Sequence, residues 1–255
     1  MKGIILAGGV GSRLLPLTEK INKHLLPIYN KPMIFYPIEF FKKLGIDEIL
    51  IVTNRENAGI TEDILGNGSR FGVDLTYKVQ EYEEGKETGI AKALELAKNF
   101  VNGERMLVQL ADNIFSMSNA EVHRLCSLIE NPKSEYSAYV FIKHISNPTE
   151  FGVPVFSKGK IIRIEEKSKK PKSNFVVTGL YSYDSSVFDK IKEIKPSPRG
   201  EYEITEVNNL YIRSGTLGYF KINCEWVDAG TFEGLYTAIK IVREGLKHKD
   251  SIFSR

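Results

Sequence analysis

Short apolar runs alternate with stretches of helical periodicity along the first half of the chain. The runs have the length and composition of buried strands, and they cover Lys2–Ala7, Glu48–Thr53, Leu75–Gln80 and Met106–Leu110. The stretches between them carry apolar residues on one helical face, and they cover Pro32–Leu44, Asn54–Gly68 and the segment from Thr88, a candidate helix cap, to about Phe100. Strands that alternate with helices predict a parallel sheet with right-handed connections.

This alternation stops in the second half. A helix over Glu121–Glu130 and a strand over Ser137–Ile142 come first. Gly and Lys/Pro turns then separate runs that predict a meander of strands over Phe151–Phe156, Lys160–Ile164 and Val176–Tyr183. The remaining pattern predicts helices over Ser185–Ile194, Glu201–Arg213 and Phe232–Gly245, a strand over Thr216–Ile222 and a turn over Trp226–Thr231. No repeat or linker separates the halves, so we expect the second half to pack onto the first.

The composition is that of an ordinary globular protein. Its 255 residues are enough for one large α/β domain, with 42% hydrophobic residues, 26% charged residues and a net charge of +3. No apolar run approaches the roughly 20 residues of a membrane helix, and the N-terminus leads directly into a strand, without a signal peptide. The basic tract 167–172 predicts a solvated loop, apart from Lys167. We expect a cytoplasmic protein without nucleic-acid or membrane partners, in which the isolated Cys126 and Cys224 are reduced thiols.

The stretch after the first strand has the residues of a phosphate-binding loop. Gly8, Gly9 and Gly11 allow a ligand to approach the backbone closely, so that N–H groups can face phosphate oxygens. Arg13 follows at once and Lys23 comes ten residues later, and two cations beside such a turn suit a polyphosphate. The loop matches neither the Walker A pattern nor G-x-G-x-x-G in register, and a plain structural turn is the alternative.

Two aspartates are candidate metal ligands. Asp112 follows the fourth predicted strand, just as the glycine loop and Gln80 lie at the ends of others, and ligands bind outside the carboxyl ends of strands in such sheets. A carboxylate there is costly unless it is paired, hydrogen-bonded or bound to metal, so a hydrogen-bonded turn is the alternative for Asp112 and for Asp228. Two carboxylates with phosphate oxygens would suit Mg²⁺, which prefers few protein ligands.

Several motifs resemble those of one enzyme family. Gly8–Thr18 and Lys23–Pro27 fit the signature G-G-x-G-[TS]-R-L-x-P-x-T followed by K-x-[LM]-[LM]-P of sugar-1-phosphate nucleotidyltransferases. Asp112-Asn113 resembles the Gly-Asp-Asn motif of bacterial glucose-1-phosphate thymidylyltransferases, and Trp226–Thr231 resembles their W-L-D-T-G-T. The resemblance covers nearly the whole chain in the expected order, and it implies Mg²⁺ on the two aspartates.

Further motifs resemble the sugar-binding part of that family. The segment 164–167 is similar to I-E-E-K-P, which implies that Glu166 binds sugar hydroxyls and that Lys167 binds the sugar phosphate. On the residues alone, a surface strand end with an ion pair between Arg163 and Glu166 is the alternative. The segment 151–153 is similar to F-G-V, whose glycine backbone contacts the sugar, and the segment 177–181 is similar to V-T-G-L-Y of the sugar pocket. We interpret the similar R-G-E-x-E-I-T-D-V-N stretch, 199–208, as mostly architectural.

The resemblance implies a fold and a set of site residues. The expected fold is a Rossmann-like wound mixed α/β sheet of the GT-A type with an inserted β-rich sugar-binding lobe. A single domain is expected over 1–255, with 1–142 mainly binding the nucleotide and 143–255 mainly the sugar phosphate. The implied catalytic residues are Arg13, Lys23 and Lys167, and the metal ligands for Mg²⁺ are Asp112 and Asp228. The implied nucleotide-binding residues are Leu6, Gly8, Gly9, Gly11, Ser12, Arg13, Gln80, Gly89 and Asp112. The implied sugar-phosphate-binding residues are Gly152, Glu166, Lys167, Val177 and Tyr181.

The implied reaction joins an NTP and a sugar 1-phosphate into an NDP-sugar and pyrophosphate. Gln80 and Gly89 resemble the two halves of Q-P-x-P-x-G-L-A, in which the Gln reads a pyrimidine, although nine positions separate them against five in the motif. A Gln amide suits thymine or uracil, so dTTP or UTP and glucose 1-phosphate are the favoured substrates.

Other features of the sequence keep alternatives open. Ala111, Ser168 and Ala229 replace the Gly, Pro and Thr of the family motifs, and the chain ends some tens of residues before the thymidylyltransferases do. The shorter C-terminus therefore disfavours the regulatory nucleotide site and the tetramer that the resemblance would imply, and a homo-oligomer stays open. The alternatives are cytidylyl or other nucleotidyl transfer to a different acceptor, and a non-catalytic nucleotide-binding protein. A Rossmann dehydrogenase is disfavoured, because no acidic residue ends the second strand.

Overall fold

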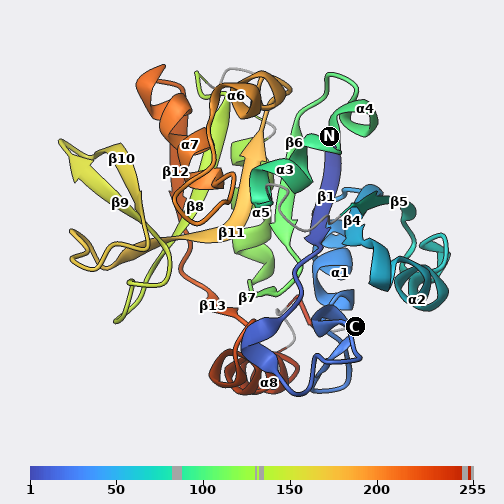
Figure 1. Cartoon of the computed structure of the whole chain (residues 1–255). Helices are drawn as coiled ribbons and strands as arrows, with labels where there is room; N and C mark the ends of the chain where they lie inside the picture. Colours follow the sequence, from blue (N-terminus) through green and yellow to red (C-terminus); the bar gives the residue numbers. More distant parts are fainter. Residues whose placement is uncertain (82–87, 130, 132–134, 249–251, 254–255) are drawn as a thin grey trace. The chain divides into compact units, whose positions relative to one another are not determined.

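The computed structural model describes residues 1–81, 88–129, 131, 135–248 and 252–253 (Figure 1). These residues form two compact units, each built from segments that are separate in the sequence. The N-terminal unit comprises Lys2–Tyr82, Gln109–Glu130 and Cys224–Arg255, and the central unit comprises Met1, Glu83–Val108 and Asn131–Asn223. In the part of the chain that the structure describes, no helix has the length and apolar character needed to cross a membrane.

The N-terminal unit is built on the parallel strands β1, β4 and β5, in that order, and it also contains the last two residues of β6. The bounds of these strands are Lys2–Ala7 (β1), Glu48–Asn54 (β4), Asp74–Gln80 (β5) and Met106–Leu110 (β6). Helix α1 (Phe35–Lys43) packs on β1, and Gly3 is what lets the two approach: a Cβ at Gly3 would lie 2.6 Å from the Phe41 ring. The unit's other longer helices are α2 (Arg55–Leu65), α5 (Asn119–Ile129) and α8 (Phe232–Gly245).

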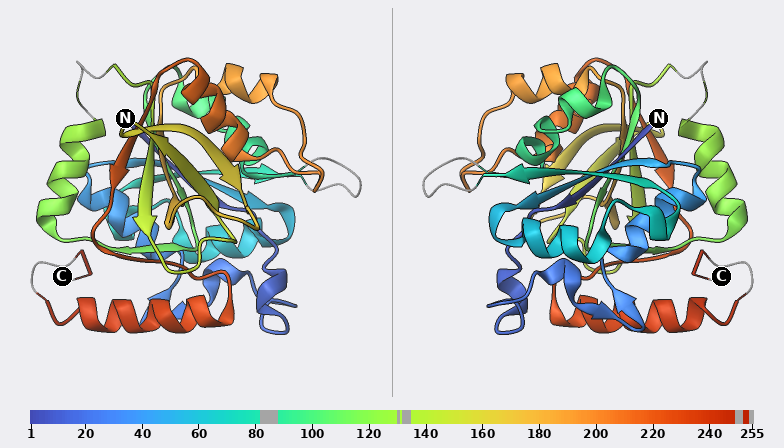
Figure 2. Two further views of the ribbon diagram at one scale, coloured as in Figure 1. Left: turned by 90° about the vertical axis from the view of Figure 1, so that its left-hand side faces the viewer. Right: turned by 90° about the vertical axis from the view of Figure 1, so that its right-hand side faces the viewer.

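Two small strand pairs complete the N-terminal unit. Strand β7 (Asn113–Ser116) pairs antiparallel with β13 (Glu225–Asp228), although more than a hundred residues separate them along the chain. Strands β2 (Pro27–Ile28) and β3 (Lys31–Pro32) form the other pair, beside which α8 lies (Figures 1 and 2). The residues directly after β1, β6 and β13 therefore belong to one compact unit.

The central unit has strands in the order β12-β8-β11-β6, with β8 antiparallel to β11 and parallel to β12. The bounds of the strands not yet given are Ala138–His144 (β8), Gly152–Ser157 (β9), Lys160–Glu166 (β10), Phe175–Tyr183 (β11) and Leu217–Lys221 (β12). Strands β9 and β10 form a separate antiparallel hairpin. The helices are α3 (Ile90–Glu95), α4 (Lys98–Val101), α6 (Val187–Glu193) and α7 (Ile204–Arg213), and α7 packs against β10 (Figure 2).

The predicted α/β fold class is confirmed, and three predicted elements differ. The expected helix from Thr88 to about Phe100 is two short helices, and Thr88 forms a strand-like bridge with Glu201 instead of capping a helix. The expected meander is wrong in its last step, because β11 pairs with β8 rather than with β10. The expected turn over Trp226–Thr231 begins as β13, whose partner β7 is too distant in the chain for local periodicity to show.

Candidate active site

The glycine loop after β1 is held in place by its own backbone. Gly11 has φ 73°, a left-handed conformation that glycine adopts without steric cost, and its carbonyl accepts hydrogen bonds from Leu14 N (2.9 Å) and Thr18 Oγ1 (2.8 Å). Ser12 and Arg13 begin a short 3-10 helix directly after it, and both are exposed. A Cβ at Gly9 would lie 3.1 Å from Lys23 Nζ, so this glycine leaves room for the lysine. The loop thus presents an open backbone beside two cations.

Lys23 is positioned by the residues on either side of it. Asn22 caps a 3-10 helix over Lys23–Leu25, its Oδ1 accepting a hydrogen bond from His24 N (3.0 Å) and lying 3.0 Å from His24 Nδ1. The His24 ring also hydrogen-bonds the backbone of Ala7, at the end of β1. Burial and the neighbouring Lys23 lower the pKa of His24 to about 3, so the ring is neutral at physiological pH. A buried neutral imidazole therefore ties the Lys23 segment to β1.

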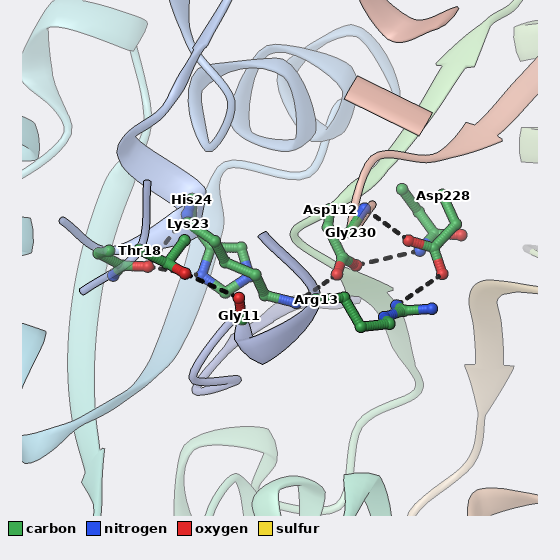
Figure 3. Close-up of polar contacts among 10 residues, drawn as sticks. Gly11, Arg13, Thr18, Lys23, His24, Asp112, Asp228 and Gly230 are labelled. Carbon is green, nitrogen blue, oxygen red and sulfur yellow. Dashed lines mark hydrogen bonds and ion pairs between the residues drawn. The ribbon is translucent and has the colours of Figure 1, made fainter. Parts of the chain in front are cut away.

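Asp112, which follows β6, is paired with Lys23 (Figure 3). Lys23 Nζ lies 2.5 Å from Asp112 Oδ2, and Asn113 Nδ2 donates to Asp112 Oδ1 at 3.2 Å. Burial by itself would raise the pKa of Asp112, but the ammonium of Lys23 outweighs burial and holds this pKa well below its usual range. Asp112 is therefore a carboxylate at all physiological pH values.

The β7–β13 pair brings Asp228 to the same place. Asp228 lies opposite Asn113 in the pair, and Ala229 N donates to the Asp112 carbonyl at 2.8 Å. Gly230 N donates to Asp228 Oδ1 at 2.7 Å, and Arg13 Nη2 lies 3.7 Å from Asp228 Oδ2 (Figure 3). Burial and the charge of Asp112 raise the pKa of Asp228, against the opposing effects of Gly230 N–H and Arg13. We call Asp112 and Asp228 the acidic pair.

The acidic pair has the properties of a cation site. A Cβ at Gly230 would lie 2.8 Å from Asp228 Oδ1 and 3.2 Å from Asp112 Oδ2, so both carboxylates converge where this residue has no side chain. The mutual repulsion that raises the pKa of Asp228 is relieved by a bound cation. Among the described residues no cluster of three or more His, Cys, Asp or Glu side chains could hold a metal. A cation here would therefore complete its coordination with water or ligand oxygens, as Mg²⁺ does.

The other predicted nucleotide residues divide between the two units. Leu6 is a buried β1 residue, and its carbonyl accepts a hydrogen bond from Ala111 N at 3.0 Å. Gln80 ends β5, and its Oε1 lies so close to Gly8 that a Cβ there would be 3.1 Å away. Gly89 belongs to the central unit, with φ 120° and its Cα packed against the Tyr202 backbone. The four additional positions between Gln80 and Gly89 fall in a segment most of which, 82–87, lies outside the described residues.

The central unit places Glu166 in a polar cluster at the end of β10. Thr205 Oγ1 donates to Glu166 Oε2 at 2.5 Å, and Arg199 Nη2 lies 3.7 Å from Glu166 Oε1. Gly152 packs beside them, because a Cβ there would lie 3.2 Å from Thr205 Oγ1 and 3.4 Å from Glu166 Oε2. Burial raises the pKa of Glu166 despite the opposing hydrogen bond from Thr205. The alternative explanation of this strand end, an ion pair between Arg163 and Glu166, does not hold, because Arg163 pairs with Glu165 instead.

Lys167 has an unusual backbone conformation. Its φ is 44°, in the left-handed region that lysine rarely adopts, and its N–H donates to the Phe151 carbonyl at 3.0 Å. The side chain is exposed, and the backbone bond fixes its origin beside Glu166. Val177 and Tyr181 lie in β11 and are both buried, 8% and 4% exposed. The structure thus groups Gly152, Glu166 and Lys167 and places the β11 residues within the sheet.

Sequence reasoning missed several residues that contact the candidate ones. Arg199 and Thr205 belong to the stretch interpreted as architectural, yet both contact Glu166. Their signal was only their place in a family motif, since nothing local predicts contact with β10. His24 and Trp226 were likewise hidden inside motifs, and Trp226 Nε1 donates to Asn113 Oδ1 at 2.8 Å, next to Asp112.

Comparison with known proteins decides the family. A family model described as nucleotidyl transferase matches residues 2–245. The chain belongs to the nucleotidyltransferase family. This confirms the resemblance that the motifs carried, and the protein is a nucleotidyltransferase.

The similar proteins carry the names of sugar-nucleotide enzymes. The chain is 38% identical to the glucose-1-phosphate thymidylyltransferase of Neisseria meningitidis, covering 95% of this chain and 83% of that protein. It is 39% identical to the thymidylyltransferase of Mycolicibacterium smegmatis, covering 97% of this chain and 85% of that one. A provisionally assigned glucose-1-phosphate thymidylyltransferase from Bacillus anthracis, solved in complex with a sucrose, matches with a TM-score of 0.87 and 46% identity over 96% of each chain. A UDP-glucose pyrophosphorylase complexed with UDP-glucose shares the fold, with a TM-score of 0.81 at 23% identity over 95% of this chain and 98% of that one.

Proposed function

We propose that this nucleotidyltransferase transfers a thymidylyl or uridylyl group from dTTP or UTP to glucose 1-phosphate, giving the NDP-sugar and pyrophosphate. The observation that carries the proposal is the meeting of Arg13 and Lys23 with the acidic pair at the ends of β1, β6 and β13. Curated relatives that cover most of the chain are glucose-1-phosphate thymidylyltransferases, which supports the same substrates.

The chemistry requires charge neutralisation more than proton transfer. A phosphate oxygen of the sugar phosphate attacks the α-phosphorus in line, and this nucleophile is already anionic, so no general base is needed. Arg13 would hold the β- and γ-phosphates and stabilise the departing pyrophosphate, while Lys23 would neutralise charge near the α-phosphate. Lys167 would hold the attacking phosphate, with its backbone fixed by the bond to Phe151.

Mg²⁺ is the proposed cofactor, with Asp112 and Asp228 as its protein ligands. When bound, it would supply positive charge to the triphosphate. The converging carboxylates fit this role, and the open glycine loop beside them leaves space for phosphate oxygens. The N-terminal unit would therefore bind the nucleotide with its metal.

Substrate selection is assigned to Gln80 and Glu166. The Gln80 amide has one donor side and one acceptor side, which suits the edge of thymine or uracil, and it lies beside Gly8 in the loop. Glu166, one oxygen of which accepts a hydrogen bond from Thr205, would accept hydrogen bonds from sugar hydroxyls.

Pyrophosphate release with Mg²⁺ tests the proposal, with dTTP, UTP, CTP, ATP and GTP each combined with a panel of sugar 1-phosphates. We expect release with dTTP or UTP and glucose 1-phosphate, and its loss in Asp112→Asn but not in Asp63→Asn, an exposed α2 residue. Release only with another pair would keep the chemistry and refute the proposed substrates; release only with CTP would favour cytidylyl transfer. If folded protein released no pyrophosphate with any combination in the panel, this would contradict the proposal and favour a binding-only role or an untested acceptor.

A further inference from the structure

The cations proposed for the phosphates are paired in this structure with the carboxylates proposed for the metal. Lys23 Nζ lies 2.5 Å from Asp112 Oδ2, and Arg13 Nη2 lies 3.7 Å from Asp228 Oδ2 (Figure 3). A carboxylate oxygen that holds an ammonium cannot hold a metal ion at the same time, because the ammonium occupies the position that the metal ion would take. The oxygens that converge beside Gly230 are Asp228 Oδ1 and Asp112 Oδ2, so a metal ion bound between them would have to displace Lys23 from Asp112 Oδ2.

The two pairs are not equivalent. The Lys23 side chain is 12% exposed and that of Asp112 is 10% exposed, whereas the Arg13 side chain is 52% exposed. A short, buried, charge-assisted hydrogen bond is stronger than a long, exposed ion pair. The Lys23–Asp112 ion pair is thus the contact that opposes metal binding.

We propose that Lys23 acts as an internal counter-ion, which occupies Asp112 in the ligand-free protein and is transferred to the nucleotide phosphates when metal takes the carboxylate. This rests on the metal assignment of the proposed function. Arg13, Lys23 and the acidic pair together carry no net charge, so a divalent cation alone adds uncompensated positive charge. A nucleoside triphosphate, with about four negative charges, offers the displaced Lys23 ammonium a new counter-charge. Metal alone consequently binds weakly, and metal and nucleotide strengthen each other's binding.

The rest of the site is built to keep Asp112 in place during this exchange. Asn113 Nδ2 donates to Asp112 Oδ1, the oxygen that Lys23 leaves open, and Trp226 Nε1 donates to Asn113 Oδ1 at 2.8 Å. An indole N–H is a donor only, so it orients the Asn113 amide with its NH₂ toward the carboxylate. Trp226 is the single tryptophan of the chain, and its fluorescence therefore reports on this site.

Amine labelling of the wild-type protein tests the displacement without any variant. Lys23 labelling, followed by mass spectrometry, is expected to speed up severalfold when Mn²⁺ is added and bound, because the ammonium leaves Asp112. Lys31 is the matched control, since its Nζ lies 2.5 Å from Glu39 Oε2 away from the acidic pair, and its labelling should not change. Unchanged labelling of Lys23 at a Mn²⁺ concentration that alters Trp226 fluorescence would overturn the proposal.

Metal affinity tests the competition directly. Lys23→Met should bind Mn²⁺ at least about tenfold more tightly than wild type without nucleotide, because no charge-assisted hydrogen bond has to be broken. It should gain less from added nucleotide, and Lys31→Met should match wild type. Equal or weaker Mn²⁺ binding by folded Lys23→Met, while Asp112→Asn loses binding, would overturn the counter-ion role alone. Mn²⁺ binding unaffected by Asp112→Asn would remove the metal assignment and the counter-ion role together.

Discussion

At the scale of single residues, the site is organised by how each charge is balanced. Asp112 has a close ammonium and a low pKa, whereas burial and the neighbouring carboxylate raise the pKa of Asp228. Arg13 is the more exposed cation and lies next to the glycine loop, free to turn toward phosphates. The proposed roles follow from this difference: without ligand Lys23 is held closely by Asp112, whereas the more exposed Arg13 has only a long contact with Asp228 to give up before it binds phosphates.

Arg13→Ala should lower turnover at least about 100-fold, comparable to the loss of one preorganised donor that stabilises developing charge. Steady-state pyrophosphate release measures it, with Arg243→Ala, an exposed α8 arginine, as the matched control. Near-normal turnover in a folded Arg13→Ala protein would exclude the role given to Arg13.

His24 gives a pH-dependent prediction for stability. Its folded pKa of about 3 lies below the ordinary 6.5, so the unfolded chain takes up this proton first as pH falls. The contribution of the neutral His24 ring to the free energy of unfolding is complete above pH 6.5 and is lost as the pH falls toward 3, at up to about 1.4 kcal/mol per pH unit. The free energy of unfolding in urea should fall less steeply over this range in His24→Gln than in wild type; parallel curves would contradict the assignment.

At the scale of elements, strands and helices that depend on local pattern were predictable from the sequence, whereas those that depend on long-range pairing were not. Strand β1 and helix α8 have the predicted bounds, Lys2–Ala7 and Phe232–Gly245, because an apolar run or a helical periodicity can be recognised within one continuous segment. Strand β13 could not be predicted this way, since its four residues become a strand only by pairing with β7. The same limit hid the contact of Arg199 and Thr205 with Glu166, while the glycine loop, the two cations and the acidic pair were found from motifs.

The start of α8 gives an element-scale prediction. Thr231 lies three residues after Asp228 and caps this helix, because its side chain accepts a hydrogen bond from Gly234 N at 3.0 Å. Thr231→Ala should cost about 1 kcal/mol in the free energy of unfolding, and Thr231→Ser should retain most of it. Chemical denaturation of the three proteins measures this, and equal stability of Ala and Ser variants would show that the cap contributes nothing.

At the scale of the whole molecule, the candidate residues fall into two sets on two compact units. Arg13, Lys23, Gln80 and the acidic pair belong to the N-terminal unit, whereas Gly152, Glu166 and Lys167 belong to the central unit. Each set has its own internal contacts, so the nucleotide should depend mainly on the N-terminal unit and the sugar phosphate on the central unit, with Gly89 of the central unit as the exception among the predicted nucleotide residues. The family, the fold class and this grouping of residues agree with one enzyme reaction that joins two anionic substrates.

Separate effects on the two KM values follow from this division. Glu166→Gln should raise the KM for glucose 1-phosphate about tenfold with little change for dTTP, and Gln80→Ala should do the reverse, because each loses a hydrogen bond to one substrate. Initial rates with one substrate varied at a time measure both constants. A Glu166→Gln effect confined to the nucleotide KM would refute the assignment of the central unit.

The most direct test of the proposed reaction is the mass of its products from dTTP and glucose 1-phosphate whose phosphate carries ¹⁸O. Attack by the sugar phosphate on the α-phosphorus keeps every labelled oxygen with the sugar, so we expect fully labelled dTDP-glucose and unlabelled pyrophosphate. Label in pyrophosphate, or pyrophosphate released without dTDP-glucose, would contradict nucleotidyl transfer to the sugar phosphate.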